Sequence, residues 1–217
     1  MEKTTGRIEA FSDGVFAVAI TLLVLDIKVP PFPSANPAFS LAKELLAEWP
    51  AYLAFLMSFL TILIMWINHH RVFTLIRLTD DRFMILNGLL LLCVTAVPFS
   101  TALLAAYIRL PDARLATLIY AGVSLLMAFS FNGLWRYAAH DGRLLDDDHD
   151  PDIAAGITKS YRFGPILYLI VFCLGFVSVT ASVGLSLLLA LFFTIPPRKH
   201  VQMAARSQGR ATDRTDL

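Results

Sequence analysis

Residues 7–29 read RIEAFSDGVFAVAITLLVLDIKV, a mostly apolar stretch that contains two aspartates, Asp13 and Asp26, after Phe11. A membrane-spanning helix needs roughly 20 mostly apolar residues, because each residue rises about 1.5 Å and the hydrocarbon core is about 30 Å thick. A charge at the centre of that core costs at least about 2.5–3.5 kcal/mol. Hydropathy alone therefore ranks this stretch as the weakest candidate span. Whether it crosses the membrane has to be judged from the rest of the sequence.

The composition is that of a membrane protein with several spans. Of the 217 residues, 57% are hydrophobic and 16% are charged, against about 45–50% and 25% in soluble domains. The formal net charge is +1, so no basic excess points to nucleic acid as a partner. Cys93 and Cys173 both lie in apolar runs, and we expect both to be small buried hydrophobes.

Five further segments complete an all-α membrane fold with six expected spans. Three of them are uninterrupted, at residues 49–68, 83–108 and 115–135. Residues 163–197 carry no charge, and one helix of that length would measure about 52 Å, so we expect a hairpin turning near Ser178–Ser182. This gives spans at about 7–29, 49–68, 83–108, 115–135, 163–178 and 182–197. We expect residues 1–197 to form one domain, with a short outer helix at 38–48 and an inner loop with an acidic run at 141–159.

The basic residues alternate with these six spans. If the amino terminus is cytoplasmic, the inner segments carry 14 of the 18 lysines and arginines and the outer segments carry the other four, Lys28, Lys43, Arg109 and Arg114. This bias follows the positive-inside rule and puts both termini in the cytoplasm, with residues 198–217 as a basic tail. Leaving out residues 7–29 breaks the alternation, so we expect this stretch to span the membrane despite its charges.

The first span has two different sides. At about 100° per residue, one face carries Phe11, Gly14, Val18, Thr21, Leu22 and Leu25, whereas Ser12 and Asp13 point elsewhere. If this face of the helix contacts lipid, its stripe of apolar residues needs no further explanation. If several subunits gather around an axis, the same stripe lines a narrow apolar constriction, and a ring of Thr21 hydroxyls gives a passing cation oxygen contacts.

Depth suggests partners for the polar side. Asp13 lies about 9 Å inside the inner boundary, and Asn87 lies about 6 Å inside it on the third span. The second span ends at this boundary with Trp66, Asn68, His69 and His70. We expect a hydrogen-bonded cluster of Ser12, Asp13, Asn87 and a histidine, which acts either as a packing clamp or as a direct proton or ion site.

The motif that begins at Arg7 resembles a known family. Arg7-Ile-Glu-Ala-Phe11-Ser12-Asp13, followed by Ala-Ile-Thr-Leu-Leu-Val-Leu at residues 19–25, is similar to the R-x-x-x-F-S-D signature of the transmembrane protein 175 family of lysosomal and prokaryotic potassium channels. Trp66-x-x-His69-His70-x-x-Phe73 resembles the second helix of that family, and Asn87 with Pro98-Phe99 fits its third. The resemblance covers most of residues 1–100.

This resemblance implies a potassium-permeable cation channel in a prokaryotic plasma membrane, built as a homotetramer whose first helices line the pore. It implies a bottleneck at Val18, further apolar layers at Leu22 and Leu25, and a selectivity-linked hydroxyl at Thr21. It also implies that Arg7, Phe11, Ser12 and Asp13 hold this helix to the next two. Val18 is smaller than the Ile or Leu that is usual at this position of the family. We therefore expect the pore to close less tightly or to be less selective for K⁺.

The other signals are weaker. The T-V-G-Y-G filter is absent, and Thr180-Ala-Ser-Val-Gly184 fits a hairpin turn. Adjacent His69 and His70 point about 100° apart, so we expect no metal site, and we expect no cofactor besides K⁺ as permeant ion. Asp26, near the outer mouth, either attracts cations or caps the helix. Membrane lipids are expected partners of the basic tail.

Two rival functions remain open from the sequence. The first is a proton-coupled or proton-permeable transporter that uses Asp13 and His69/His70, although no inverted repeat supports it. The second is an intramembrane enzyme, which lacks an H-E-x-x-H or G-x-S-x-G motif. We therefore expect the chain not to be an enzyme.

Overall fold

The computed structural model describes residues 5–30, 40–146 and 151–194, and these ranges are helical apart from short connections and one β-bridge between Ile76 and Leu145. The long helices are α1 (Thr5–Leu22), α3 (Trp49–Phe73), α4 (Asp81–Tyr107) and α5 (Ala113–Ala139). The shorter α-helices are α2 (Leu41–Ala47), α6 (Pro151–Tyr161), α7 (Gly164–Val177) and α8 (Val179–Thr194). Two 3₁₀ turns, η1 (Leu23–Asp26) and η2 (His140–Gly142), follow α1 and α5.

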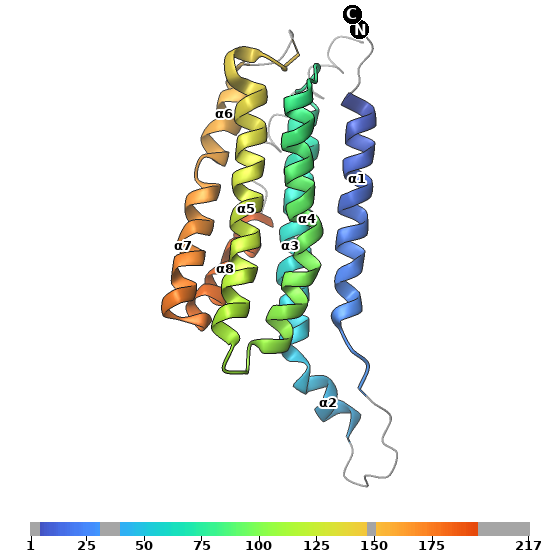
Figure 1. Ribbon diagram of the computed structural model, residues 1–217, viewed down its shortest axis with the longest axis vertical. Coiled ribbons are helices and arrows are strands. Elements are labelled where there is room, and N and C mark those ends of the chain that lie inside the picture. Colours follow the sequence, from blue (N-terminus) through green and yellow to red (C-terminus); the bar gives the residue numbers. More distant parts are fainter. Residues whose placement is uncertain (1–4, 31–39, 147–150, 195–217) are drawn as a thin grey trace, which may run out of the picture.

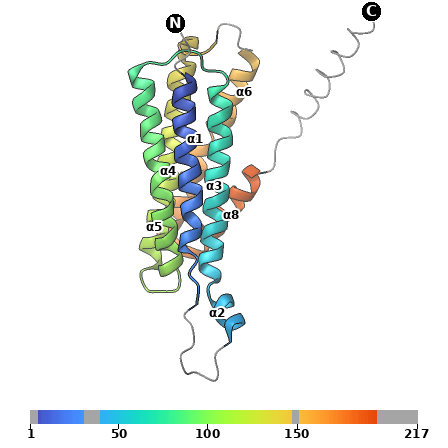
Figure 2. The same cartoon turned by 90° about the vertical axis from the view of Figure 1, so that its right-hand side faces the viewer.

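The long helices form one bundle with α1 at its edge (Figure 1). Seen from that edge, α1 lies in front of α3 and α4, the two helices that it contacts (Figure 2). On the far side of α4 the packing continues through α5 to α7 and α8. The helix α1 is thus supported along one side and open along the other.

Within the described residues, five segments are long and apolar enough to span a membrane: Thr5–Asp26, Trp49–Phe73, Asp81–Tyr107, Ala113–Gly142 and Pro151–Val177. The first of them was expected to rank lowest in hydropathy, but its mean hydropathy of 2.0 exceeds the 1.6 of the fourth and the fifth, so that expectation was wrong. The chain turns at Ser178, whose backbone is extended at φ −148° and ψ 115°. The expected sixth span corresponds to α8, which has only 16 residues, or about 24 Å of helix. Residues 195–197 of that expected span lie outside the described residues.

The connections alternate between the two ends of the bundle (Figure 1). The start of α1, the α3–α4 link and the α5–α6 link lie at one end, which carries the segments that were predicted to be inner and basic. The helix α2, the α4–α5 link and the α7–α8 turn lie at the other. We call the first of these the basic end.

Two further expectations were wrong. Residues 151–159, expected within a loop, belong to α6, whose buried Ala154 and Ile157 face the bundle. The apolar residues Ile153 and Ile157 lie four apart, a helical spacing that the loop prediction overlooked. Trp135 Nε1 donates to Thr158 Oγ1 at 2.9 Å and attaches this helix to α5. Cys173 is exposed on the protomer whereas Cys93 is buried, because an apolar helix in a membrane can face lipid instead of protein. The predicted acidic run consists of Asp146, Asp147, Asp148 and Asp150, of which only Asp146 lies within the described residues.

The α3–α4 link is tied to the α5–α6 link at the basic end. Arg77 N donates to Leu144 O at 2.9 Å, and Asp146 N donates to Leu75 O at 3.0 Å. Asp80 caps α4, since its Oδ1 accepts from Phe83 N at 2.8 Å and its Oδ2 accepts from Tyr137 OH at 2.6 Å. The phenol of Tyr137 and then the amide of Phe83 hold the pKa of Asp80 below its usual value of 3.8.

We expect Tyr137→Phe to lower the stability of the folded protein at neutral pH and to have little effect on it in acid. A carboxylate with a lowered folded-state pKa contributes stability above pH 3.8, and this contribution is lost as the pH falls through the folded-state pKa. One bond to a charged acceptor at this partly exposed site contributes about 1 kcal/mol, or roughly 2–4 °C in Tm. Thermal unfolding in detergent at neutral pH and near pH 3 measures the difference, with Tyr107→Phe at the opposite end as control. An equal Tm loss at both pH values would contradict the assignment.

Candidate pore-lining helix and its polar clamp

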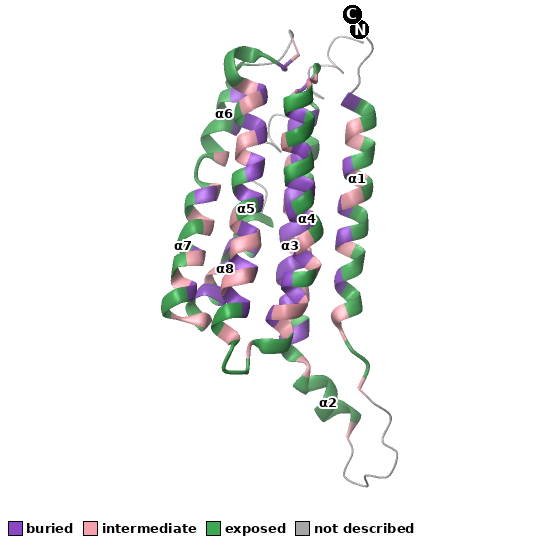
Figure 3. Ribbon diagram, in the orientation of Figure 1, coloured by how far each residue is buried: buried purple, intermediate pink, exposed green. Residues whose placement is uncertain are grey.

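The two sides of α1 differ sharply in burial. Thr5, Ser12, Phe16 and Ala19 of α1 and Leu23 of η1 are buried against the bundle. The stripe that was predicted from helical spacing is exposed on the protomer: Phe11, Gly14, Val18, Thr21, Leu22 and Leu25 (Figure 3). Val18 is 58% exposed and Leu25 is 72% exposed. The stripe is therefore not part of the interior of the single chain.

The hydroxyl of Thr21 has a fixed orientation within this stripe. Its Oγ1 lies 2.9 Å from both Ala17 O and Val18 O, so its single proton is donated to these carbonyl oxygens. With the proton directed back along the helix, the lone pairs of Oγ1 stay available to a ligand on the exposed side. The helix then tightens into η1 from Leu23, and it ends where Ile27 becomes extended.

A chain of three buried side chains joins α1 to α4 and α3. Ser12 Oγ donates its only proton to Ile8 O at 2.8 Å, so it must accept from Asn87 Nδ2 at 3.0 Å. The Oδ1 of Asn87 is thereby turned towards His69 Nε2, also at 3.0 Å. His69 must then carry its proton on Nε2. The donor and the acceptor of each of these three hydrogen bonds are therefore fixed.

His69 is wholly buried and packed between aromatic rings. Its ring stacks on Phe73 with 4.2 Å between centroids, and Phe16 of α1 lies 5.3 Å away. Its Nδ1 is buried and has no hydrogen-bond partner among the described residues. This imidazole is thus a packed member of the junction between α1 and α3 with one unused acceptor.

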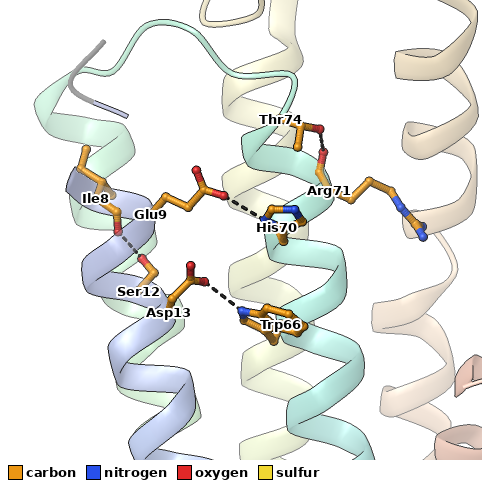
Figure 4. Close-up of polar contacts among 8 residues, drawn as sticks. All are labelled: Ile8, Glu9, Ser12, Asp13, Trp66, His70, Arg71 and Thr74. Atoms are coloured by element: carbon orange, nitrogen blue, oxygen red, sulfur yellow. Dashed lines mark hydrogen bonds and ion pairs between the residues drawn. The ribbon is translucent and has the colours of Figure 1, made fainter. Parts of the chain in front are cut away.

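Two more contacts hold α1 to α3 nearer the surface (Figure 4). Trp66 Nε1 donates to Asp13 Oδ1 at 2.9 Å, and His70 Nδ1 lies 2.9 Å from Glu9 Oε1. The partners are four residues apart on each helix, so the two contacts stack one turn above the other. We call Glu9, Ser12, Asp13, Trp66, His69, His70 and Asn87 the polar clamp.

The clamp differs in part from the predicted one. Asp13 bonds to Trp66 instead of joining Ser12 and Asn87. Asn68 accepts from Tyr161 OH at 3.1 Å, which joins α3 to α6 and not to α1. Arg7 is exposed, and Phe11 is 68% exposed; within the described residues the structure brings neither into the clamp. Glu9 was missed, although its position one turn before Asp13 was a usable signal.

Asp26 ends η1 at the far end of α1, opposite the clamp. It is half-buried, and its Oδ2 is buried without a partner among the described residues. The described residues contain no group of three or more His, Cys, Asp or Glu side chains that could hold a metal ion. His69 and His70 make the separate contacts given above.

Residues 7–98, which include the whole clamp and all of α1 but its first two residues, match the family described as endosomal/lysosomal potassium channel TMEM175. A potassium channel of Chamaesiphon minutus is 55% identical over 194 residues, which cover 89% of this chain and 95% of the relative. The chain belongs to the TMEM175 family.

The similarity extends to three dimensions and beyond bacteria. The crystal structure of a lysosomal potassium-selective channel TMEM175 homolog from Chamaesiphon minutus matches with a TM-score of 0.79 and 54% identity, over 88% of this chain and 96% of that one. The human endosomal/lysosomal proton channel TMEM175 is 34% identical over 138 residues, which are 61% of this chain and 27% of the human protein. Membership places the chain among integral membrane cation channels, which are not enzymes.

Proposed function

We propose that four copies of this chain form a potassium-permeable channel whose pore is lined by the four α1 helices. The observation that carries this proposal is the exposed apolar stripe on a helix whose opposite side is fixed by three polar contacts. Its support also includes the relatives that are named as potassium channels. The proposal includes six spans per subunit, with α8 as the sixth, both termini in the cytoplasm of a prokaryotic cell, and residues 1–197 as one domain.

The stripe supplies both a barrier and a weak selectivity element. Rings of Val18, Leu22 and Leu25 make a constriction that water leaves readily, so ions pass only when it widens or wets. Thr21 Oγ1 presents lone pairs between these rings and replaces part of the hydration shell of K⁺. Asp26 raises the cation concentration at the outer mouth. Arg7, Phe11 and Asn68 are proposed to support the clamp only indirectly.

The second candidate function is a proton-permeable or proton-coupled transporter. The unpartnered Nδ1 of buried His69 and the half-buried carboxylate of Asp13 favour it, and the human relative is named a proton channel. The fixed direction of the Ser12–Asn87–His69 chain argues against it. A proton relay needs hydrogen bonds that can reverse, and the amide of Asn87 cannot pass a proton on.

Flux from liposomes separates the two functions. We expect the reconstituted protein to pass K⁺ down its gradient when an ionophore has abolished the proton gradient, and to give unitary currents in bilayers. Asp13→Asn keeps an acceptor oxygen for Trp66 and removes the charge, so it should preserve this flux. K⁺ flux that stops without a proton gradient, or a folded Asp13→Asn variant with no cation flux, would favour the transporter.

A further inference from the structure

The outer surface of α4 and α5 carries an apolar groove that the channel function does not use. The two helices lie side by side on the face of the bundle shown in Figure 1. Between them is a hollow of about 400 Å³, with Leu92, Leu126 and Phe129 on its walls and Cys93 and Ser130 at its floor. These three wall residues are each more than half exposed, whereas the two floor residues are each 8% exposed.

The groove has the length of one membrane leaflet. Its lining runs from Leu86 to Ala96 on α4 and from Val123 to Gly133 on α5. Ten residues of helix rise about 15 Å, which is half of a hydrocarbon core of about 30 Å. Both segments belong to candidate spans and lie towards the basic end. An acyl chain of the lipid leaflet at the basic end would therefore fit along the groove.

Basic side chains lie at the mouth of the groove. Arg82 precedes Leu86 by four residues on α4, and Arg136 follows Gly133 by three on α5, so both continue the faces that line the groove. The bond between Asp80 and Tyr137 puts the start of α4 level with the last turn of α5. Arg82 and Arg136 are exposed, and neither forms an ion pair with a described residue.

Carboxylates also lie near this mouth, and the charge of Arg82 acts on Asp80. Asp80 and Asp81 lie at the same level, but both oxygens of Asp80 are occupied by Phe83 N and Tyr137 OH. Arg143 adds a third guanidinium, which contacts the phenol of Tyr137 and lies 5.4 Å from its ring centroid. An apolar groove with exposed guanidiniums at its mouth matches an amphiphile with an anionic head.

We propose that this groove is a binding site for an anionic phospholipid, with one acyl chain between α4 and α5 and the headgroup phosphate between Arg82 and Arg136. Arginine suits this role because its planar fork of donors binds phosphate oxygens. The site depends on membrane insertion and not on the identity of the permeant ion. It is therefore separable from the proposed channel function.

Native mass spectrometry of the intact, full-length oligomer tests the proposal. The protein in detergent receives equal amounts of dioleoyl phosphatidylglycerol and dioleoyl phosphatidylcholine, and the ratio of the two bound lipids is measured. We expect phosphatidylglycerol to be retained preferentially, and R82Q/R136Q to lower the ratio roughly 10- to 30-fold, since each basic side chain near the headgroups contributes about 5-fold. The matched control R109Q/R114Q removes the same charge at the other end and should leave the ratio unchanged.

A groove-filling variant tests the acyl chain separately. Nothing lies within 4 Å of a Cβ added at Gly133, so Gly133→Phe should fold and should reduce binding of both lipids. With the unaltered protein, free glycerol phosphate should fail to displace phosphatidylglycerol. Equal retention of the two lipids, equal effects of the two double variants, or displacement by glycerol phosphate would overturn the proposal. So would a changed oligomer mass of Gly133→Phe with normal lipid binding, which would make the groove an interface between subunits.

Discussion

Val18→Ala should raise the resting K⁺ current at least about tenfold and should raise the permeability to Na⁺ relative to K⁺. A tenfold change needs a barrier only about 1.4 kcal/mol lower. Removing two carbons from each of four valines removes an apolar contribution larger than this energy, at about 0.8 kcal/mol per CH₂. Leu25→Ala should act in the same direction. Bilayer currents give the size of the effect, and reversal potentials under K⁺/Na⁺ bi-ionic conditions give the selectivity.

Val24→Ala is the matched control for this experiment. Val24 is 53% exposed, close to the 58% of Val18, but it lies off the stripe on the side of the helix. Its truncation removes the same two carbons and should leave current and reversal potential near those of the unaltered protein. Unchanged currents in both Val18→Ala and Leu25→Ala, or an equal response in Val24→Ala, would mean that the stripe is not the constriction.

Asn87→Leu should destabilise the protein by about 3 kcal/mol and lower its Tm by roughly 6–12 °C. Asn87 is 3% exposed, so its loss leaves the Nε2–H of His69 buried without an acceptor and Ser12 Oγ without its donor. Each buried group left unpaired costs about 1–3 kcal/mol, and 1 kcal/mol is roughly 2–4 °C in a chain of this length. Thermal unfolding in detergent measures the loss.

A double-mutant cycle distinguishes the buried chain from ordinary packing. Replacing both partners by apolar groups removes the unpaired donor, so His69→Leu together with Asn87→Leu should cost less than the sum of the two single changes. Asn132→Leu, which removes a bond from Nδ2 to Tyr161 O away from α1, should be additive with His69→Leu. Additive losses in the Asn87 cycle would show that Asn87 and His69 are not coupled.

The sequence predicted the spans better than it predicted the neighbours of individual side chains. The alternation of basic residues identified residues 7–29 as a span although Asp13 and Asp26 lowered their hydropathy. Charge asymmetry reports on topology and does not depend on any single residue in the span. The same reasoning could not find α6, because a helix of 11 residues is too short to give the signal of a membrane span.

The rise per residue predicted that Ser12, Asn87 and a histidine lie at the same depth in the membrane. In the structure, hydrogen bonds join Ser12, Asn87 and His69. Depth does not fix the direction in which a side chain leaves its helix. That is why Asp13 was expected beside Asn87 but contacts Trp66, and why Asn68 faces Tyr161 of α6. Glu9 was overlooked because it lies nearer the surface, where a charge needs no special explanation.

Thiol modification of Leu25→Cys tests most directly whether the exposed stripe of α1 faces the ion path. In a background with Cys93 and Cys173 replaced by alanine, a charged methanethiosulfonate reagent added during bilayer recording should block the K⁺ current of Leu25→Cys. It should leave that of Val24→Cys unchanged. Mass spectrometry verifies that both thiols have reacted. Full modification of Leu25→Cys with no change in current would place this edge of α1 away from the path of the ions.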